Sequence, residues 1–140
     1  MSATSLDALV AYLESLDRAS VHRMDRHYTE DAYFKDPFNE VHGVANIKKI
    51  FDRMFEQVEA PRFVILQRVF QGGEGFLLWD MHFHFRGSAQ AQRIHGTSHI
   101  KLATDGRVCY HRDYWDTGEE LYGKIPGLRA LFRWLRRRAG

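Results

Sequence analysis

Hydrophobic residues recur with a helical period in the first part of the chain and with a period of two in the second. Apolar positions three and four apart predict a helix over residues 5–17, a short helix near 20–28, and a third helix that starts at Val44 and is closed by Pro61. The remaining pattern predicts strands over residues 32–36, 62–71, 75–86, 91–103 and 107–116, with turns at the glycines between the last four. Helices followed by an antiparallel meander indicate an α+β fold.

A further helical extension is predicted over residues 117–140. The segment from Thr117 to Glu120 has the form of a capping box, which is typical of a helix start. A basic last helix follows, with an apolar stripe made of Leu128, Leu131, Phe132 and Leu135. The 140 residues are the length of one domain, so we expect residues 1–140 to form a single unit.

Hairpin geometry predicts which strand residues share a face of the sheet. A two-residue turn at Asp105-Gly106 places Ser98 opposite Asp113 and Ile100 opposite His111. For the preceding hairpin we expect Met81 opposite Ser98, Phe83 opposite Gly96, and His84 beside His95. One face is then mostly apolar, holds Ser98, His111 and Asp113, and should be covered by helices. The other face is polar and rich in His and Arg, and a slip by one residue would exchange the two faces.

Composition and charge narrow the class of protein. The chain is 44% hydrophobic and 27% charged, which is typical of a globular protein. Its net charge of +2 combines a basic segment over 124–140, with six bases and no acid, and an acidic body with 14 bases and 18 acids. An acidic body argues against a nucleic-acid partner. Cys109 is the lone cysteine and no apolar run could span a membrane, so we expect a cytoplasmic protein.

One segment carries a family resemblance. The stretch Tyr28-Thr29-Glu30-Asp31-Ala32-Tyr33-Phe34-Lys35-Asp36-Pro37, with the element order, resembles the nuclear transport factor 2-like superfamily, and within it the SnoaL-like and ketosteroid isomerase branch. The resemblance covers residues 5–116. It implies a cone-shaped curved antiparallel sheet wrapped around three N-terminal helices, a hydrophobic pocket, and a homodimer formed through the outer sheet face.

The same resemblance suggests catalytic residues. Asp36 matches the general base of the isomerase, Tyr12 the tyrosine that donates to the enolate oxygen, and Tyr28 a tyrosine that supports it. Ser98 stands where the isomerase has a second oxyanion donor, a protonated aspartic acid, and is a weaker donor. SnoaL-like cyclases instead have their base on a later strand, a role that Asp113 could fill.

The residues themselves leave alternatives open. Asp113 near His111 and Ser98 on an apolar face must be either paired or used, because a buried charge is costly. It is therefore a candidate base or one end of a structural link. Asp36 is either a base whose pKa is raised at a pocket mouth or the ordinary opener of an Asp-Pro turn. A Ser-His-Asp nucleophilic triad is not expected, because no oxyanion hole accompanies it.

Binding residues and partners follow from the same faces. Candidates for lining a pocket, or for an ordinary core, are Tyr28, Phe34, Trp79, Met81, Phe83 and Trp115. The histidines 82, 84, 95 and 99 are a weak metal candidate, and we expect no metal. No Gly-x-Gly-x-x-Gly or phosphate loop is present, so no cofactor is expected. Membrane contact by the Arg-rich last helix is less favoured than contact with the pocket mouth or a partner subunit.

These observations favour an enzyme that applies carboxylate acid–base chemistry to a small apolar carbonyl or polycyclic compound, as an isomerase, cyclase or hydrolase. Asp36 or Asp113 would be the base, and Tyr12 and Ser98 would stabilise the oxyanion. Two alternatives remain: a non-catalytic protein that holds a small apolar ligand in the same pocket, and an adaptor with a filled pocket.

Overall fold

The computed structural model describes residues 3–120 and 126–139. The helical elements are α1 (Ala3–Glu14), the 3-10 helix η1 (Ser20–Arg26), α2 (Val44–Gln57), α3 (Thr117–Glu120) and α4 (Pro126–Ala139). The strands are β1 (Tyr28–Lys35), β2 (Glu40–His42), β3 (Val58–Gln71), β4 (Glu74–Phe85), β5 (Ala91–Leu102) and β6 (Val108–Tyr114).

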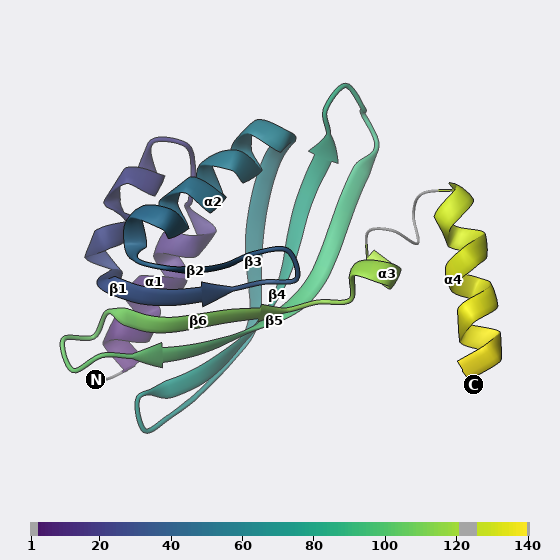
Figure 1. Cartoon of the computed structure of the whole chain (residues 1–140). Coiled ribbons are helices and arrows are strands. Elements are labelled where there is room, and N and C mark those ends of the chain that lie inside the picture. The colour runs from purple at the N-terminus through teal and green to yellow at the C-terminus, as the bar shows by residue number, and fades with distance from the viewer. Residues whose placement is uncertain (1–2, 121–125, 140) are drawn as a thin grey trace.

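The strands form one curved, unclosed sheet in the order β2-β1-β6-β5-β4-β3, with α1, η1 and α2 packed in its hollow (Figure 1). Strands β1 and β6 pair in parallel and all other pairs in this sheet are antiparallel. This arrangement confirms the predicted α+β fold with a cone-like sheet around N-terminal helices.

The core lies between the helices and the concave face of the sheet. Helix α2 buries Ile47, Phe51 and Phe55, which recur four residues apart along one side. Leu77 of β4 and Ile100 of β5 face the helices and are fully buried. Helical and strand periods therefore converge on one apolar interior, as the sequence pattern predicted.

The register of the β4–β5 hairpin differs from the prediction by four residues. Leu77 lies opposite Ser98 and Trp79 opposite Gly96, and the chain turns at Gly87, which has a φ of 78°. A left-handed glycine suits a tight turn there, and that turn sets the register. Because four is an even number, every side chain keeps the predicted face. The prediction that His84 and His95 are neighbours was wrong, since His95 lies opposite Asp80.

The register of β5 with β6 is confirmed at the positions that matter for the site. Ser98 pairs with Asp113 and Ile100 with His111. The turn is longer than two residues, because the Ala103 amide donates to the Arg107 carbonyl, and a bulge between Lys101 and Leu102 absorbs the difference.

Two local predictions around α2 were incomplete. The β2 strand before Gly43 was not predicted, because three residues are too few to show alternation. Helix α2 ends at Gln57, and Pro61 lies inside β3 rather than ending a helix. Proline is tolerated there because the β3–β4 register shifts between Glu59 and Arg62, where no ladder hydrogen bond is needed.

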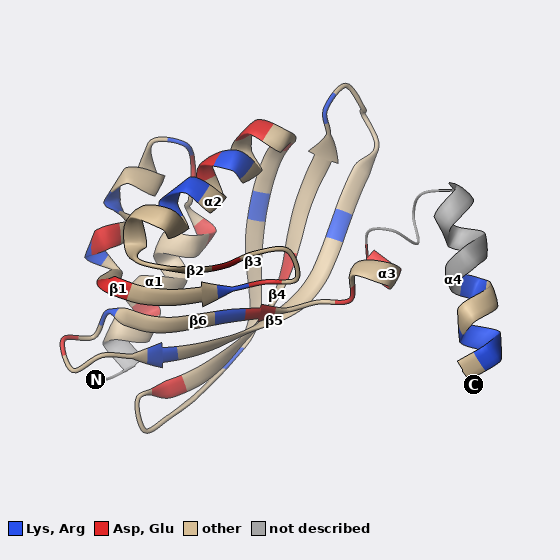
Figure 2. Ribbon diagram, in the orientation of Figure 1, with Lys and Arg blue, Asp and Glu red and all other residues tan. Residues whose placement is uncertain are grey.

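The predicted C-terminal helices are present as α3 and α4. The cap of α3 is Asp116 rather than Thr117, since the Glu119 amide donates to the Asp116 carboxylate at 3.1 Å. Of the predicted apolar stripe of α4, residues 128, 131 and 132 lie outside the described side chains, and Leu135 is exposed. Figure 2 shows basic residues gathered on the end of α4 and both signs of charge mixed over the sheet and α2. Within the described residues, no helix has the length and apolar character needed to cross a bilayer.

Candidate active site

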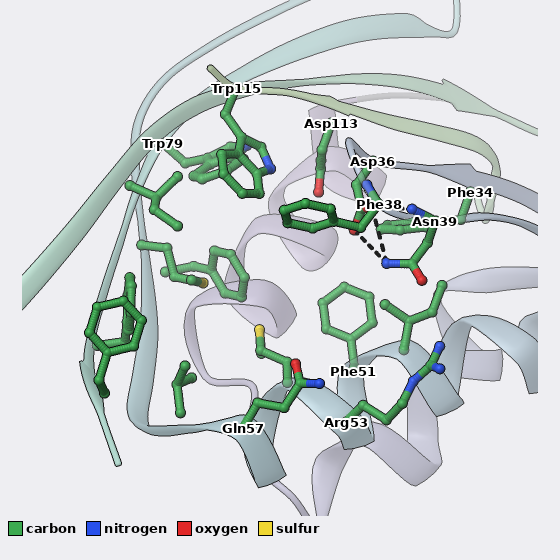
Figure 3. A pocket seen from close by; sticks show the side chains of 18 residues that line it. Phe34, Asp36, Phe38, Asn39, Phe51, Arg53, Gln57, Trp79, Asp113 and Trp115 are labelled. Carbon is green, nitrogen blue, oxygen red and sulfur yellow. Dashed lines mark hydrogen bonds between the residues drawn. The ribbon is translucent and has the colours of Figure 1, made fainter. Parts of the chain in front are cut away.

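A pocket of about 460 Å³ opens between the concave face of the sheet and α2. Its walls are mostly apolar and include Phe51 of α2, Phe63 of β3, Trp79 and Phe83 of β4 and Ile94 of β5. Its polar lining residues are Asp36, Asn39, Arg53, Gln57 and Asp113. Figure 3 shows the two carboxyl groups entering from one side, and Arg53 and Gln57 on α2 at the opposite side.

The parallel pairing of β1 with β6 brings the two carboxyl groups together. Lys35, the last residue of β1, lies beside Arg112 of β6. Asp36 and Asp113 are the next residues along the two segments and are therefore also neighbours. Phe34 and His111, one pleat earlier, also pair, with ring centroids 4.9 Å apart. The alternation of the strands therefore places both aspartates on the concave, pocket-facing side.

Asp113 is held through one of its two oxygens. The Ser98 hydroxyl donates to Oδ1 at 2.5 Å, and His111 Nε2 lies 2.6 Å from the same atom. No hydrogen bond from a described residue reaches Oδ2. One oxygen thus fixes the orientation of the carboxylate, and the other keeps its lone pairs available to a molecule in the pocket.

Buried partners orient both groups that hold Asp113. The Tyr28 hydroxyl lies 2.7 Å from His111 Nδ1, and complete burial raises the pKa of Tyr28 well above its ordinary value. A protonated Tyr28 hydroxyl can donate to Nδ1, and in that arrangement the Nε2–H of His111 donates to Asp113. Trp79 Nε1 donates to the Ser98 oxygen at 2.8 Å. The polar side-chain atoms of Tyr28, His111, Ser98 and Trp79 therefore all have a partner, as buried groups require.

Gly96 makes room for the indole in this network. A Cβ atom at position 96 would lie 2.6 Å from Trp79 Cη2, closer than packed atoms approach. The ring thus lies directly over the backbone of β5, where its N–H reaches Ser98. Glycine at this position has a packing role and needs no unusual backbone angle.

Asp36 is tied to the turn that follows β1. Its Oδ1 accepts hydrogen bonds from the Phe38 amide at 2.8 Å, the Asn39 amide at 2.7 Å and the Asn39 side chain at 3.1 Å. Its Oδ2 has one longer contact, 3.3 Å, to the same Asn39 side chain. Burial raises the pKa of Asp36, and the nearby charge of Asp113 raises it further, although the hydrogen bonds oppose this shift.

The structure sorts the sequence-predicted residues into three positions. Those that line the pocket are Phe34, Asp36, Trp79, Met81, Phe83, Asp113 and Trp115. Ser98, His111 and Tyr28 lie behind this lining and contact it through Asp113 and Trp79.

Tyr12 lies away from the pocket. Its hydroxyl donates to the Ser20 carbonyl at 2.8 Å, and its ring stacks on His27 with centroids 4.2 Å apart. Burial raises the pKa of Tyr12 to about 12, so the hydroxyl remains a donor to that carbonyl. The position that the resemblance assigned to an oxyanion donor is therefore used to join α1 to η1, because the side chain points toward η1 rather than into the hollow.

Sequence reasoning missed the lining residues on α2 and in the turn. Arg53 and Gln57 are four residues apart and so share one side of α2, at the edge of its apolar face. Asn39 follows the Asp36-Pro37 turn. A polar pair bordering an apolar helix face is the signal that could have suggested Arg53 and Gln57, while Asn39 carried no comparable signal.

The outer-face histidines have carboxylate neighbours. His95 Nδ1 lies 2.7 Å from Asp80 Oδ1, and His99 Nε2 lies 2.5 Å from Glu74 Oε1. Among the described residues, no three His, Cys, Asp or Glu side chains are grouped closely enough to hold a metal ion.

Comparison with known proteins places this fold and pocket in a family. The model of the SnoaL-like domain matches residues 9–111, so the chain belongs to the SnoaL-like domain family. The comparison with curated proteins gave no significant match.

Solved structures with the same fold carry several different activity names. A putative SnoaL-like polyketide cyclase from Shewanella denitrificans superposes with a TM-score of 0.73 at 16% identity, covering 89% of this chain and 98% of that one. An epoxide hydrolase from M. tuberculosis, described as LEH-like, has a TM-score of 0.68 at 19% identity and covers 92% of each chain. A putative isomerase of the SnoaL-like family from Agrobacterium tumefaciens has a TM-score of 0.65 at 19% identity, with coverages of 81% and 95%. At these identities the likeness establishes the fold alone.

Proposed function

We propose that this protein is an enzyme that removes a proton from carbon next to the carbonyl group of a small apolar compound, with Asp113 as the general base. The observation that carries the proposal is the one-sided anchoring of Asp113. Ser98 and His111 bind its Oδ1, no described residue donates a hydrogen bond to Oδ2, and Asp113 lines a pocket with mostly apolar walls. A carboxylate with a fixed orientation and a poorly solvated oxygen has the properties of an effective base.

In the proposed step, a C–H bond next to the carbonyl breaks and its proton moves to Asp113 Oδ2. The electron pair left on carbon moves into the carbonyl group and gives its oxygen a negative charge. His111 and Ser98 keep the carboxylate aligned during the transfer. Isomerisation and ring closure can both start from this step, in agreement with the activities named for the isomerase and the cyclase of the same fold.

The size of the pocket also suits a small bound molecule. Its volume of about 460 Å³ and aromatic walls suit a compound with a few fused rings. A non-catalytic role as a binding protein would use the same walls but would not need an aligned carboxylate.

A generic base-sensitive probe tests the proposal without knowledge of the natural substrate. In 5-nitrobenzisoxazole, removal of the ring proton by a carboxylate breaks the N–O bond and releases a coloured phenolate. We expect the protein to accelerate this reaction and Asp113→Asn to reduce the rate by about 10²- to 10⁴-fold, the range of general base catalysis.

Asp80→Asn is the matched control, since Asp80 is also buried and bonded to a histidine but lies on the outer face. We expect it to retain the probe reaction within about twofold, because it does not touch the pocket. Equal rates for the wild type and Asp113→Asn would contradict the base assignment and would favour the binding role.

A further inference from the structure

Proton removal next to a carbonyl needs a group that stabilises the charge developing on the oxygen. The two donors expected from the sequence do not supply it. The Ser98 hydroxyl donates to Asp113, and the Tyr12 hydroxyl donates to the Ser20 carbonyl outside the pocket. A different donor must therefore reach the substrate oxygen if the proposed reaction takes place.

Asp36 is the group whose geometry fits this need. Its Oδ1 is saturated by three N–H groups of the turn, and its Oδ2 has only the 3.3 Å contact to Asn39. Asp36 and Asp113 leave neighbouring parallel strands and enter the pocket from the same side (Figure 3). A carboxylic acid whose carbonyl oxygen accepts from N–H groups presents its O–H from the other oxygen.

We propose that Asp36 is the general acid of the reaction and hands a proton from Oδ2 to the substrate oxygen while Asp113 removes the proton from carbon. This inference rests on the proposed function and reverses the role that the family resemblance assigns to Asp36. In the step, the C–H bond and the Asp36 O–H bond break, and the Asp113 O–H bond and the substrate O–H bond form. The product is a neutral enol, with the proton from Asp36 on its oxygen; Asp36 is left ionised, and Asp113 holds the proton taken from carbon.

Charge balance in the pocket supports this division of roles. Two ionised carboxylates side by side repel each other, and an enolate would add a further negative charge within the apolar walls. With Asp36 as acid, the two carboxyl groups together carry one negative charge before and after the step. The raised pKa of Asp36, which follows from its burial and from the charge of Asp113, favours the protonated form in the same direction.

The arrangement also defines the substrate class. The acid and base lie on one side of the pocket, so the carbonyl and its acidic C–H must lie at one end of the molecule, with an apolar body against Phe83 and Phe63. This describes an apolar ketone or related carbonyl compound whose reactive end enters first.

Two probes whose leaving oxygens differ in basicity distinguish an acid role of Asp36 from a base role. The phenolate released from 5-nitrobenzisoxazole is stable and gains little from protonation, whereas the phenolate from unsubstituted benzisoxazole is basic and gains much. We expect Asp36→Asn to lower kcat/KM for benzisoxazole at least about tenfold more than for the nitro compound. Asparagine can keep the Oδ1 acceptor of the turn but has no proton of comparable acidity to give.

Each outcome of this comparison is decisive. An equal small loss for both probes would overturn the acid role and leave Asp36 as a turn residue. An equal loss as large as that of Asp113→Asn would make Asp36 a base and would also overturn it. If Asp113→Asn abolishes turnover while Asp36→Asn shows no difference between probes, the proposed function stands and only this inference fails. Asp31→Asn is the control, because Asp31 is an exposed aspartate of β1, the strand that precedes Asp36, and it should affect neither probe.

A titration decides the question even if neither probe is turned over. With ¹³C-labelled aspartate carboxyl groups, and the Asp36 resonance assigned through Asp36→Asn, we expect the Asp36 carboxyl group to titrate above the ordinary aspartate value of 3.8. Titration of Asp36 at or below that ordinary value would overturn the proposal regardless of turnover.

Discussion

The sheet carries two Asp–His pairs, one on each face, and their surroundings differ although their bonds are alike. Asp113 and His111 on the concave face are 2.6 Å apart, and Asp80 and His95 on the convex face are 2.7 Å apart. The His111 side chain is 4% exposed, whereas that of His95 is 45% exposed. The inner histidine is held on both nitrogens, while the outer one meets water.

The two aspartates also differ in the surroundings of their second oxygen, Oδ2. Asp80 Oδ2 lies 3.7 Å from Arg93 Nη1, so the outer carboxylate is balanced by a cation. Asp113 Oδ2 has no hydrogen bond from a described residue, and Asp113 lines the pocket. The same residue pair thus lies beside an exposed arginine in one place and lines a pocket in the other, and this difference is the reason that we propose a catalytic role for Asp113 and none for Asp80.

Replacement of the two histidines should give the largest difference in stability between the faces. His111→Phe leaves the buried Tyr28 hydroxyl without its partner and takes from Asp113 Oδ1 one of its two hydrogen bonds, and we expect the free energy of unfolding to fall by about 3 kcal/mol. His95→Phe should cost less than about 1 kcal/mol, because water can replace an exposed imidazole. Urea unfolding of both variants measures this. Equal losses of unfolding free energy in the two variants would mean that burial adds nothing to the stability contributed by the Asp–His hydrogen bond.

Removal of single hydroxyl groups should give a smaller difference. Tyr28→Phe removes the buried bond to His111 and should lower stability by about 1 kcal/mol. Tyr33→Phe removes an exposed bond to Glu40 and should change stability by less than about 0.5 kcal/mol. In the probe reaction, we expect Tyr28→Phe to be a few-fold slower than Tyr33→Phe, since His111 would lose the partner that fixes its ring.

The smallest expected effect concerns the pH dependence of stability. Since burial raises the pKa of Asp36 in the folded protein, the folded state binds this proton more tightly than the unfolded chain. The stability contributed by that proton is present at low pH and is lost as the pH rises from the ordinary value of 3.8 through the folded pKa. Asp36→Asn lacks this loss, so its free energy of unfolding should rise relative to the wild type over that range.

Asp31→Asn is the control for this measurement, because Asp31 is an exposed residue of β1. Its stability relative to the wild type should stay nearly constant over the same range of pH. A parallel course of the Asp36→Asn and wild-type curves, measured by urea unfolding at a series of pH values, would contradict the assigned direction of the Asp36 shift.

Short-range patterns determined much of this protein. The alternation in β4, β5 and β6 determined which side chains face the interior, and it did so despite a four-residue error in one register, because side chains repeat every two residues. The place of the Asp105-Gly106 turn indicated the pairing of Ser98 with Asp113, although the turn is longer than two residues and a bulge between Lys101 and Leu102 absorbs the difference. The network around Asp113 therefore could be predicted in its main members.

Only the tertiary structure decided which side chains reach the pocket and what they do there. Asp36 meets Asp113 because β1 pairs in parallel with β6, a contact between distant segments that no local pattern encodes. Tyr12 points toward η1 and Arg53 toward the pocket, and both directions depend on how α1 and α2 sit in the hollow. Local periodicity determines the face of an element, whereas the packing of elements against one another determines which atoms share a site.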